Sequence, residues 1–114
     1  MEIIRSSSEN LSKRDLYNLS RSPKIKKMRD YVGVEIPVGK YLIYTDKNAN
    51  GEVTTVLSVE NRETGDVIAG NSQTARTEFE YIADLMEDDD DDFSIRICEG
   101  TSKNGRPYLT VALV

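Results

Sequence analysis

The order of its extended and helical segments most constrains what this chain can fold into. Three stretches in which apolar and polar residues alternate come first, and a period of two is typical of strands. One amphipathic helix follows them, and two further alternating stretches follow the helix. The strands are expected at residues 32–44, 52–61, 66–69, 93–98 and 108–114, and the helix is expected at residues 75–86.

The helix and the turns have clear signals of their own. The apolar stripe expected on the helix consists of Ala75, Phe79, Ile82, Ala83 and Met86. Turn-forming residues separate neighbouring strands at residues 46–51, 62–65 and 101–106. Asn104 and Gly105 are the expected tip of the last turn, because this pair tolerates positive φ. Residues 37–39, Pro-Val-Gly, interrupt the first strand and predict a bulge or bend there.

Three strands, a helix and two strands are the order of the OB-fold, a small β-barrel. We therefore expect a mainly β, α+β chain in which residues 32–114 form a five-stranded OB-like barrel, ordered β-β-β-α-β-β and closed into a cylinder around its helix. Residues 1–31 are expected to form a basic helical N-terminal arm of the same structural unit. An open α+β sheet with the helix on one face is the alternative that the pattern leaves open.

The N-terminal arm carries its own helix signals. Ser12 is the expected N-cap of a short helix with Asp15 at the third helical position. Pro23 should end or interrupt this helix, because proline lacks the backbone donor and restricts the residue before it. Residues 24–29 are expected to make another helical turn with the basic side chains outside.

The composition argues against catalysis and against a membrane span. The 114 residues include no histidine, which is the usual proton shuttle at neutral pH, and no glycine-rich phosphate loop or metal-ligand cluster. We expect no catalytic residue, no metal and no cofactor. Cys98 has no partner for a disulfide and is expected to be a buried or half-buried thiol. The N-terminal residues lack the apolar core of a signal peptide, so we expect a cytoplasmic protein that does not enter a membrane.

The net charge of −5 is unevenly distributed. Residues 1–30 carry eight basic and four acidic side chains, which leaves +4. Residues 31–114 carry the remaining 7 basic and 16 acidic side chains, which leaves −9. Because docking depends on the local charge rather than on the total, the net charge does not by itself exclude a nucleic-acid partner.

A binding surface is expected at the rim of the barrel. In the OB-fold, ligands lie across the second and third strands and between the loops that join strands one to two and four to five. Cations that contact phosphates and aromatic rings that stack on bases are typical of single-strand binding. The candidate nucleic-acid-binding residues are Lys24, Lys26, Lys27, Arg29, Tyr44, Lys47, Arg96, Lys103, Arg106 and Tyr108.

These residues have structural readings as well. Tyr31 and Tyr41 are further candidate platforms, but each of the strand tyrosines is equally compatible with packing at the barrel edge, with its hydroxyl in water. The basic residues 21–29 are compatible with a solvated helical face or with a contact to the acidic run of a neighbouring subunit. That run, the five aspartates at 88–92, is expected to be a solvated loop after the helix. It is also open to a role as a partner of the basic segment or as a mimic of phosphates, whereas its spacing does not fit an EF-hand.

The chain also resembles a family. Several segments are similar to small single-stranded DNA-binding-type proteins, above all residues 100–106, Gly-Thr-Ser-Lys-Asn-Gly-Arg. The other segments are residues 11–17 and 22–28, the stretches 44–46, 50–52 and 71–72, and Phe79. Such proteins are encoded by phages and mobile elements of Gram-positive bacteria. The resemblance implies an OB-like barrel and a role in phage DNA replication or recombination.

The sequence therefore predicts a non-enzymatic, phage-encoded single-stranded DNA-binding protein that acts as a homo-oligomer in the host cytoplasm. The alternative is a phage-encoded inhibitor that uses its acidic surface as a nucleic-acid mimic against a host nuclease or defence complex. A structural component of a phage particle, for which small β-rich domains are common material, also remains open.

Overall fold

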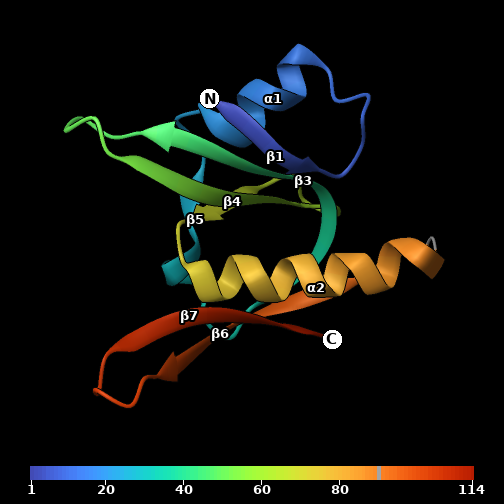
Figure 1. Cartoon of the computed structure of the whole chain (residues 1–114). Helices are drawn as coiled ribbons and strands as arrows, with labels where there is room; N and C mark the ends of the chain where they lie inside the picture. Colours follow the sequence, from blue (N-terminus) through green and yellow to red (C-terminus); the bar gives the residue numbers. More distant parts are fainter. Residues whose placement is uncertain (90) are drawn as a thin grey trace.

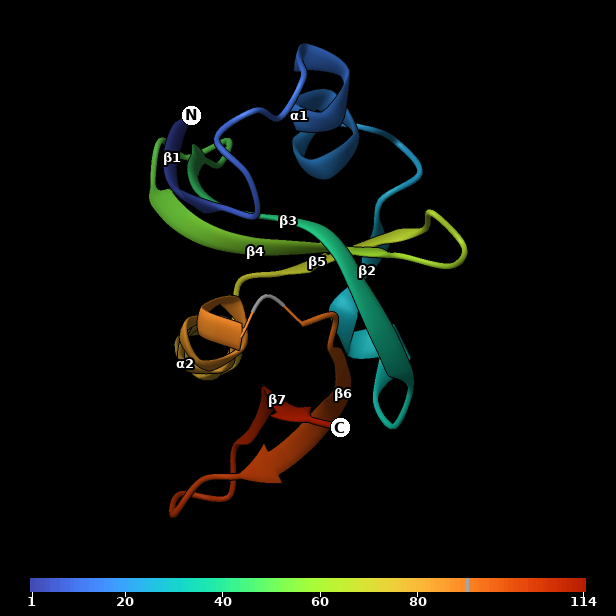
Figure 2. The ribbon, with the colours of Figure 1, turned by 90° about the vertical axis from the view of Figure 1, so that its right-hand side faces the viewer.

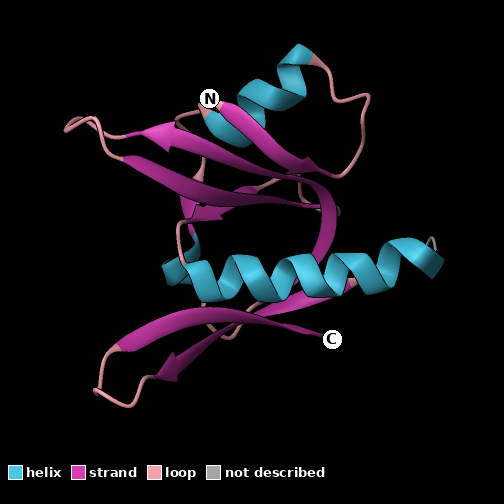
Figure 3. Cartoon of the chain, in the orientation of Figure 1, coloured by secondary structure: helices cyan, strands magenta, loops and turns pink. Residues whose placement is uncertain are grey.

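Strands dominate the fold, and they form one strongly curled sheet that stays open on one side (Figures 1 and 3). The computed structural model describes residues 1–89 and 91–114. Its elements are β1 (Glu2–Ser6), α1 (Lys13–Ser20), β2 (Lys26–Lys27), the 3-10 helix η1 (Met28–Tyr31), β3 (Glu35–Lys47), β4 (Val53–Asn61), β5 (Val67–Gly70), α2 (Gln73–Asp89), β6 (Ser94–Thr101) and β7 (Pro107–Leu113).

The long strand β3 organises the sheet. Hydrogen-bonded neighbours follow the order β2-β5-β4-β3-β6-β7, and β1 pairs with β3 beside this path. Residues 35–37 of β3 pair with β6, whereas residues 38–47 pair with β4. The register shifts between Val38 and Tyr41, where β3 bends sharply from one half of the sheet to the other (Figure 2). The bulge predicted from the Pro-Val-Gly sequence is therefore confirmed.

Gly39 allows this bend because the neighbouring backbone is very close. A Cβ at residue 39 would lie 3.2 Å from the Cα of Arg62 and 2.8 Å from a carboxylate oxygen of Glu60. Since a backbone atom cannot move aside as a flexible side chain can, a larger residue here would push the two strands apart. This bend in β3 curves the sheet around α2 (Figure 2).

The main core lies between α2 and the concave face of the sheet. The predicted apolar stripe of α2 is confirmed, because Phe79 and Ala83 are completely buried and Met86 packs against the same core. The Phe79 ring meets the Tyr41 ring edge-on, with their centroids 4.9 Å apart. The sheet supplies the rest of this core from Ile43, Leu57, Val59, Ile95, Ile97 and Val111.

A second, smaller core lies on the other face of the same sheet, under α1. Leu19 of α1 is buried there together with Leu42, Tyr44 and Val67. Alternation along β3 explains this arrangement, since residues 41 and 43 face α2 whereas residues 42 and 44 face α1. The two helices thus cover opposite faces of the curled sheet (Figure 1).

The N-terminal segment differs from the expected helical arm. The cap at Ser12 is confirmed, because its hydroxyl accepts from the Asp15 amide while the Asp15 carboxylate accepts from the Ser12 amide. However, residues 2–6 form β1 on the edge of β3, and Lys26 and Lys27 form β2 beside β5. The helical turn expected at residues 24–29 is therefore wrong for residues 26 and 27, whereas residues 28 and 29 begin the 3-10 helix η1. Residues 26 and 27 are extended because they pair with Ile68 and Ala69.

The sheet also does not close into the expected cylinder. In the part of the chain that the structure describes, the path of paired strands ends at β2 and at β7, and no pairing joins β5 to β7. The edge of β5 that would close the barrel is instead occupied by β2. The described residues thus form seven strands rather than five, and an opening remains between β5 and β7.

Smaller differences concern the ends of elements. Val32 and Val34 precede β3 and are about two-fifths exposed, so the first strand begins later than predicted. Helix α2 continues to Asp89, so the aspartate run starts inside the helix, and Asp90 lies outside the described residues. Cys98 is half-buried, as expected. Neither helix in residues 1–89 and 91–114 has the length and apolar character needed to cross a membrane.

Candidate functional site

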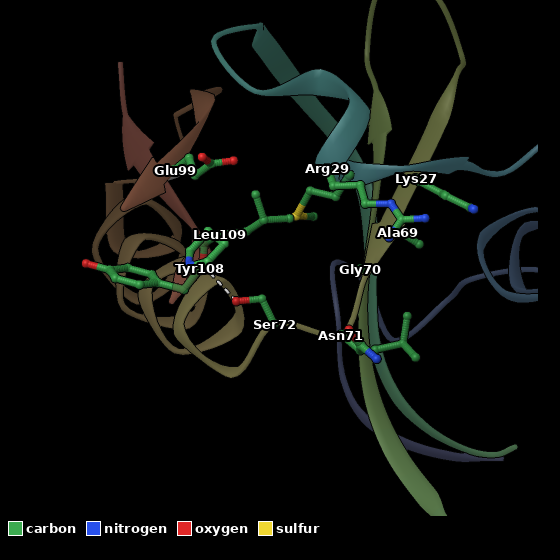
Figure 4. Close-up of a pocket in the computed structure, with 12 residues that line it drawn as sticks. Lys27, Arg29, Ala69, Gly70, Asn71, Ser72, Glu99, Tyr108 and Leu109 are labelled. Carbon is green, nitrogen blue, oxygen red and sulfur yellow. Dashed lines mark hydrogen bonds between the residues drawn. The ribbon is translucent and has the colours of Figure 1, made fainter. Parts of the chain in front are cut away.

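The opening between β5 and β7 contains a groove of about 800 Å³ (Figure 4). One wall is formed by Lys27, Arg29, Ala69 and Gly70, from β2, η1 and β5. The opposite wall comes from β6 and β7. The lining there and at the base of the groove consists of Glu99, Pro107, Tyr108, Leu109, Asn71 and Ser72.

The first wall is shaped by the short element η1. Met28 turns into the core and is only 1% exposed, which leaves Lys27 and Arg29, its neighbours in sequence, exposed. Met28 packs against Gly70, where an added Cβ would lie 3.1 Å from the Met28 Cβ. The absence of a side chain at Gly70 therefore keeps η1 close to β5. The result is a wall that carries two cations beside the apolar side chains of Met28 and Ala69.

The second wall is held to the start of α2 by one serine. The hydroxyl of Ser72 donates to the carbonyl oxygen of Leu109 at 2.7 Å and accepts from the amide of Ala75 at 3.2 Å. Ser72 thus caps the first turn of α2 and also attaches β7 to it. Its contact with β7 cannot be predicted from the sequence, because residues 72 and 109 are far apart along the chain.

Tyr108 is the aromatic residue of the groove. It is 39% exposed and lies on the β7 wall, with its hydroxyl end directed away from Ala69 and Gly70 (Figure 4). Tyr108, Lys27 and Arg29 are all among the nucleic-acid-binding residues that the sequence predicts. The structure brings these three residues, from segments about eighty residues apart, to the same groove.

Tyr44 is not part of this surface. Its side chain is 4% exposed in the second core, and its hydroxyl donates to the carbonyl oxygen of Ser20 at 3.4 Å. Burial, followed by the nearby charge of Asp46, raises the pKa of Tyr44. A base cannot stack on a ring that is enclosed in this way, so the prediction that Tyr44 binds nucleic acid is wrong. Tyr41 is 2% exposed and is excluded for the same reason.

Three of the predicted cations lie away from the groove lining. Lys26 forms an ion pair with Asp66 at 3.4 Å, and its pKa is raised by the Tyr31 hydroxyl and then by Asp66. Lys24 lines a separate pocket of about 230 Å³ on the α1 side. Arg96 forms an ion pair with Glu35 on the adjacent strand.

The other predicted cations lie in two turns, of which the β6–β7 turn adjoins the groove through Pro107. Lys103 and Arg106 are exposed in the turn between β6 and β7, directly before Pro107 and Tyr108. Lys47 is exposed at the end of β3, where the turn to β4 begins. Both turns extend to the same side of the molecule, at the left of Figure 1. Glu99 is the acidic residue of the groove lining.

The acidic side chains of α2 are concentrated toward the opposite end of the helix. Asp84 and Glu87 form ion pairs with Arg5 of β1, at 2.5 and 2.8 Å. Asp92 lies 3.8 Å from Arg62 and is otherwise largely exposed. The groove lies at the start of α2, where Asn71 and Ser72 line it. The cations of the groove lining are therefore near one end of this helix, and the ion-paired carboxylates are near the other.

Comparisons with known proteins leave the site to be judged from its geometry. No protein-family model, no curated protein and no solved structure was found to match this chain. Within residues 1–89 and 91–114, no group of three or more histidine, cysteine, aspartate or glutamate side chains is arranged to hold a metal ion.

Proposed function

We propose that this chain is a non-enzymatic single-stranded DNA-binding protein that holds the strand in the groove between η1 and β7. The observation that carries the proposal is the arrangement around that groove. Lys27 and Arg29 lie on one wall, Tyr108, which is 39% exposed, lies on the other, and Met28, Val56 and Leu109 add apolar surface to the lining. A cationic wall and an aromatic platform are the two components that sequence-tolerant single-strand binding requires.

We further propose that the fold is an OB-like barrel opened at one seam. The strands β3 to β7 and the helix between β5 and β6 support this assignment, since each of β4 and β6 pairs with β3. The OB-fold is itself partly open, and its ligands lie beside the loops that correspond to residues 48–52 and 102–106. The groove is located on the side to which these two loops extend.

The chemistry of the groove matches an unpaired nucleotide. A base needs a flat apolar partner on its π-face, and this face is accessible only when the base is not stacked in a duplex. Tyr108 provides the ring, while Lys27 and Arg29 are placed to contact phosphates. A volume of about 800 Å³ is within the range of small-molecule pockets and has room for a nucleotide. Lys103 and Arg106 would extend the cationic path along the backbone.

The role in phage DNA replication or recombination, and the action as a homo-oligomer, are proposed from the resemblance in the sequence. Residues 100–106, which carry that resemblance most strongly, form the end of β6 and the turn that flanks the groove. The part of the chain with the strongest family resemblance is therefore part of the proposed interface.

Fluorescence anisotropy with a labelled oligo-dT strand tests the proposal directly. At low salt we expect binding that an unlabelled single strand displaces and a duplex of the same length does not. Combining Lys27→Ala with Arg29→Ala should weaken binding, whereas Lys24→Ala and Arg96→Ala should leave it unchanged because both residues are outside the groove lining. An absence of binding at low salt, where attraction to phosphates is strongest, would refute the proposal.

One observation supports the second candidate function, an inhibitor that imitates nucleic acid. The outer face of α2 exposes Tyr81 and Leu85, which are 61% and 48% accessible, between the carboxylates of Glu78 and Asp88. Spacing by three and four residues places these side chains on one side of the helix. Glu78→Gln with Asp88→Asn should abolish capture of a host protein if this face acts as a mimic. The same change should leave or increase DNA binding if the first proposal holds.

A further inference from the structure

Gly100 lies directly opposite Tyr108 on the neighbouring strands β6 and β7. The three atoms nearest to a side chain at residue 100 would all belong to the tyrosine ring. An ideal Cβ there would lie 2.5 Å from the Tyr108 hydroxyl oxygen and 2.9 Å from its Cε2, and closer still to its Cζ. Ordinary van der Waals contacts begin near 3.4 Å. The outer end of the ring therefore lies across the backbone of Gly100.

This contact leaves the Tyr108 ring little freedom. Its backbone is paired with Gly100, and the next residue, Leu109, accepts the hydrogen bond from Ser72 at the start of α2. The ring is thus supported along β6, and its strand is attached to the helix. Since 39% of the residue remains exposed, part of the ring is still available to a ligand.

The geometry points to Gly100 as a positioning residue for binding an unpaired base. In this inference, which rests on the proposed function, the missing side chain lets the Tyr108 ring rest on β6 in the orientation that a base then stacks on. A ring that is ordered before binding loses less freedom when the ligand arrives. The ligand class is a flat aromatic ring joined to a phosphate, because Lys27 and Arg29 lie on the opposite wall.

Pairs of glycine and an aromatic residue across strands also occur for stability alone, because the ring covers the bare backbone. The position of this pair distinguishes the two roles. A purely structural ring could be placed anywhere on the sheet, whereas Tyr108 belongs to the lining of the groove that also contains Lys27 and Arg29. The experiment must therefore measure ligand binding and ring position separately from stability.

A double-mutant cycle with Gly100→Ala and Tyr108→Ala provides the first measurement. Tyr108→Ala should weaken oligo-dT binding roughly 5- to 160-fold, which corresponds to the usual strength of one stacked base. Gly100→Ala should cause a comparable loss, and adding it to Tyr108→Ala should cause almost none. Tyr108→Phe, which keeps the ring, should bind like the wild type. Thermal unfolding of each variant ensures that affinities are compared between folded proteins.

NMR of the wild-type protein supplies a readout that needs no variant. The outer end of the Tyr108 ring lies close to the α-carbon of Gly100, so we expect its ring current to shift the Gly100 α-protons upfield. Titration with oligo-dT should move the ring resonances of Tyr108 while the Gly100 α-protons stay upfield. This outcome means that the base stacks on a ring that remains on β6, and it supports the inference even where Gly100→Ala does not fold.

The outcomes separate the two proposals. If the wild type binds no oligonucleotide while the Gly100 α-protons are upfield, the proposed function is wrong, and the pair is structural only. If the wild type binds and Tyr108→Ala weakens binding, but Gly100→Ala binds normally, the proposed function stands and the positioning role is refuted. Loss of the upfield shift on titration would also refute it, because the ring would then have left Gly100.

Discussion

Arg5 joins three elements that are far apart in the sequence, and its removal gives the sharpest test of the fold. From β1, its guanidinium donates to Asp84 and Glu87 of α2, at 2.5 and 2.8 Å. Its Nε donates to the hydroxyl of Tyr41 on β3 at 3.2 Å, and that hydroxyl donates to the second carboxylate oxygen of Glu87. Burial opposes the charge of Arg5, but these partners outweigh it and raise its pKa.

The expected loss of stability follows from how exposed these groups are. The Arg5 side chain is 23% exposed, whereas Asp84 and Glu87 are 68% and 48% exposed. Exposed ion pairs contribute about 0–1 kcal/mol, and hydrogen bonds to charged groups that are partly buried contribute about 1.5–3 kcal/mol. We therefore expect Arg5→Ala to lower the free energy of unfolding by about 2 kcal/mol. Arg5→Lys should recover less than half, because an ammonium cannot span both carboxylates as the planar guanidinium does.

Arg96 is the matched control for this prediction. It forms one ion pair with Glu35, and the two side chains are 48% and 50% exposed. Arg96→Ala should therefore cost at most about 0.5 kcal/mol. Urea denaturation followed by circular dichroism measures both variants, and the thermal midpoint of Arg5→Ala should fall by roughly 8–12 °C. Equal losses for the two variants would show that the contact between β1 and α2 contributes no more than a surface pair.

Three further predictions follow from the structure. Phe79→Ala should lower the free energy of unfolding by about 3–5 kcal/mol, because the ring is completely buried. Urea denaturation measures this loss, and a loss below about 1 kcal/mol would contradict the place of Phe79 in the core. Removing both Lys27 and Arg29 should reduce the slope of log affinity against log salt by roughly 1.4, since each phosphate contact on a single strand adds about 0.7, and an unchanged slope in anisotropy titrations would place the phosphates elsewhere. The pKa of Asp15 is lowered by the hydrogen bond from Lys40, so its contribution to stability is present above the unfolded value near pH 4 and is lost as the pH falls through the lower folded value. Asp15→Asn should therefore destabilise the protein at neutral pH and converge with the wild type in acid, and a constant difference across denaturation curves from neutral to acidic pH would exclude this explanation.

Local patterns in the sequence were sufficient for much of the fold. The apolar stripe of α2 predicted which helix face is buried, because spacing by three and four is a property of the helix itself. The cap at Ser12 and the glycine turn at Gly105, where φ is 76°, were also readable, since each depends on residues only a few positions apart. The expected strands coincide within a few residues with β3 to β7.

Only the tertiary structure decided which of these segments meet. Nothing local distinguishes Tyr44, which is buried under α1, from Tyr108, which lines the groove. Likewise, only the pairing of β2 with β5 places Lys27 and Arg29 opposite Tyr108 and leaves the sheet open. The sequence by itself determined β3 to β7, α2 and their apolar faces, because these depend on neighbours along the chain, whereas β1 and β2 form only by pairing with distant strands. The groove required the structure, because pairing between distant strands depends on how the whole chain buries its apolar surface.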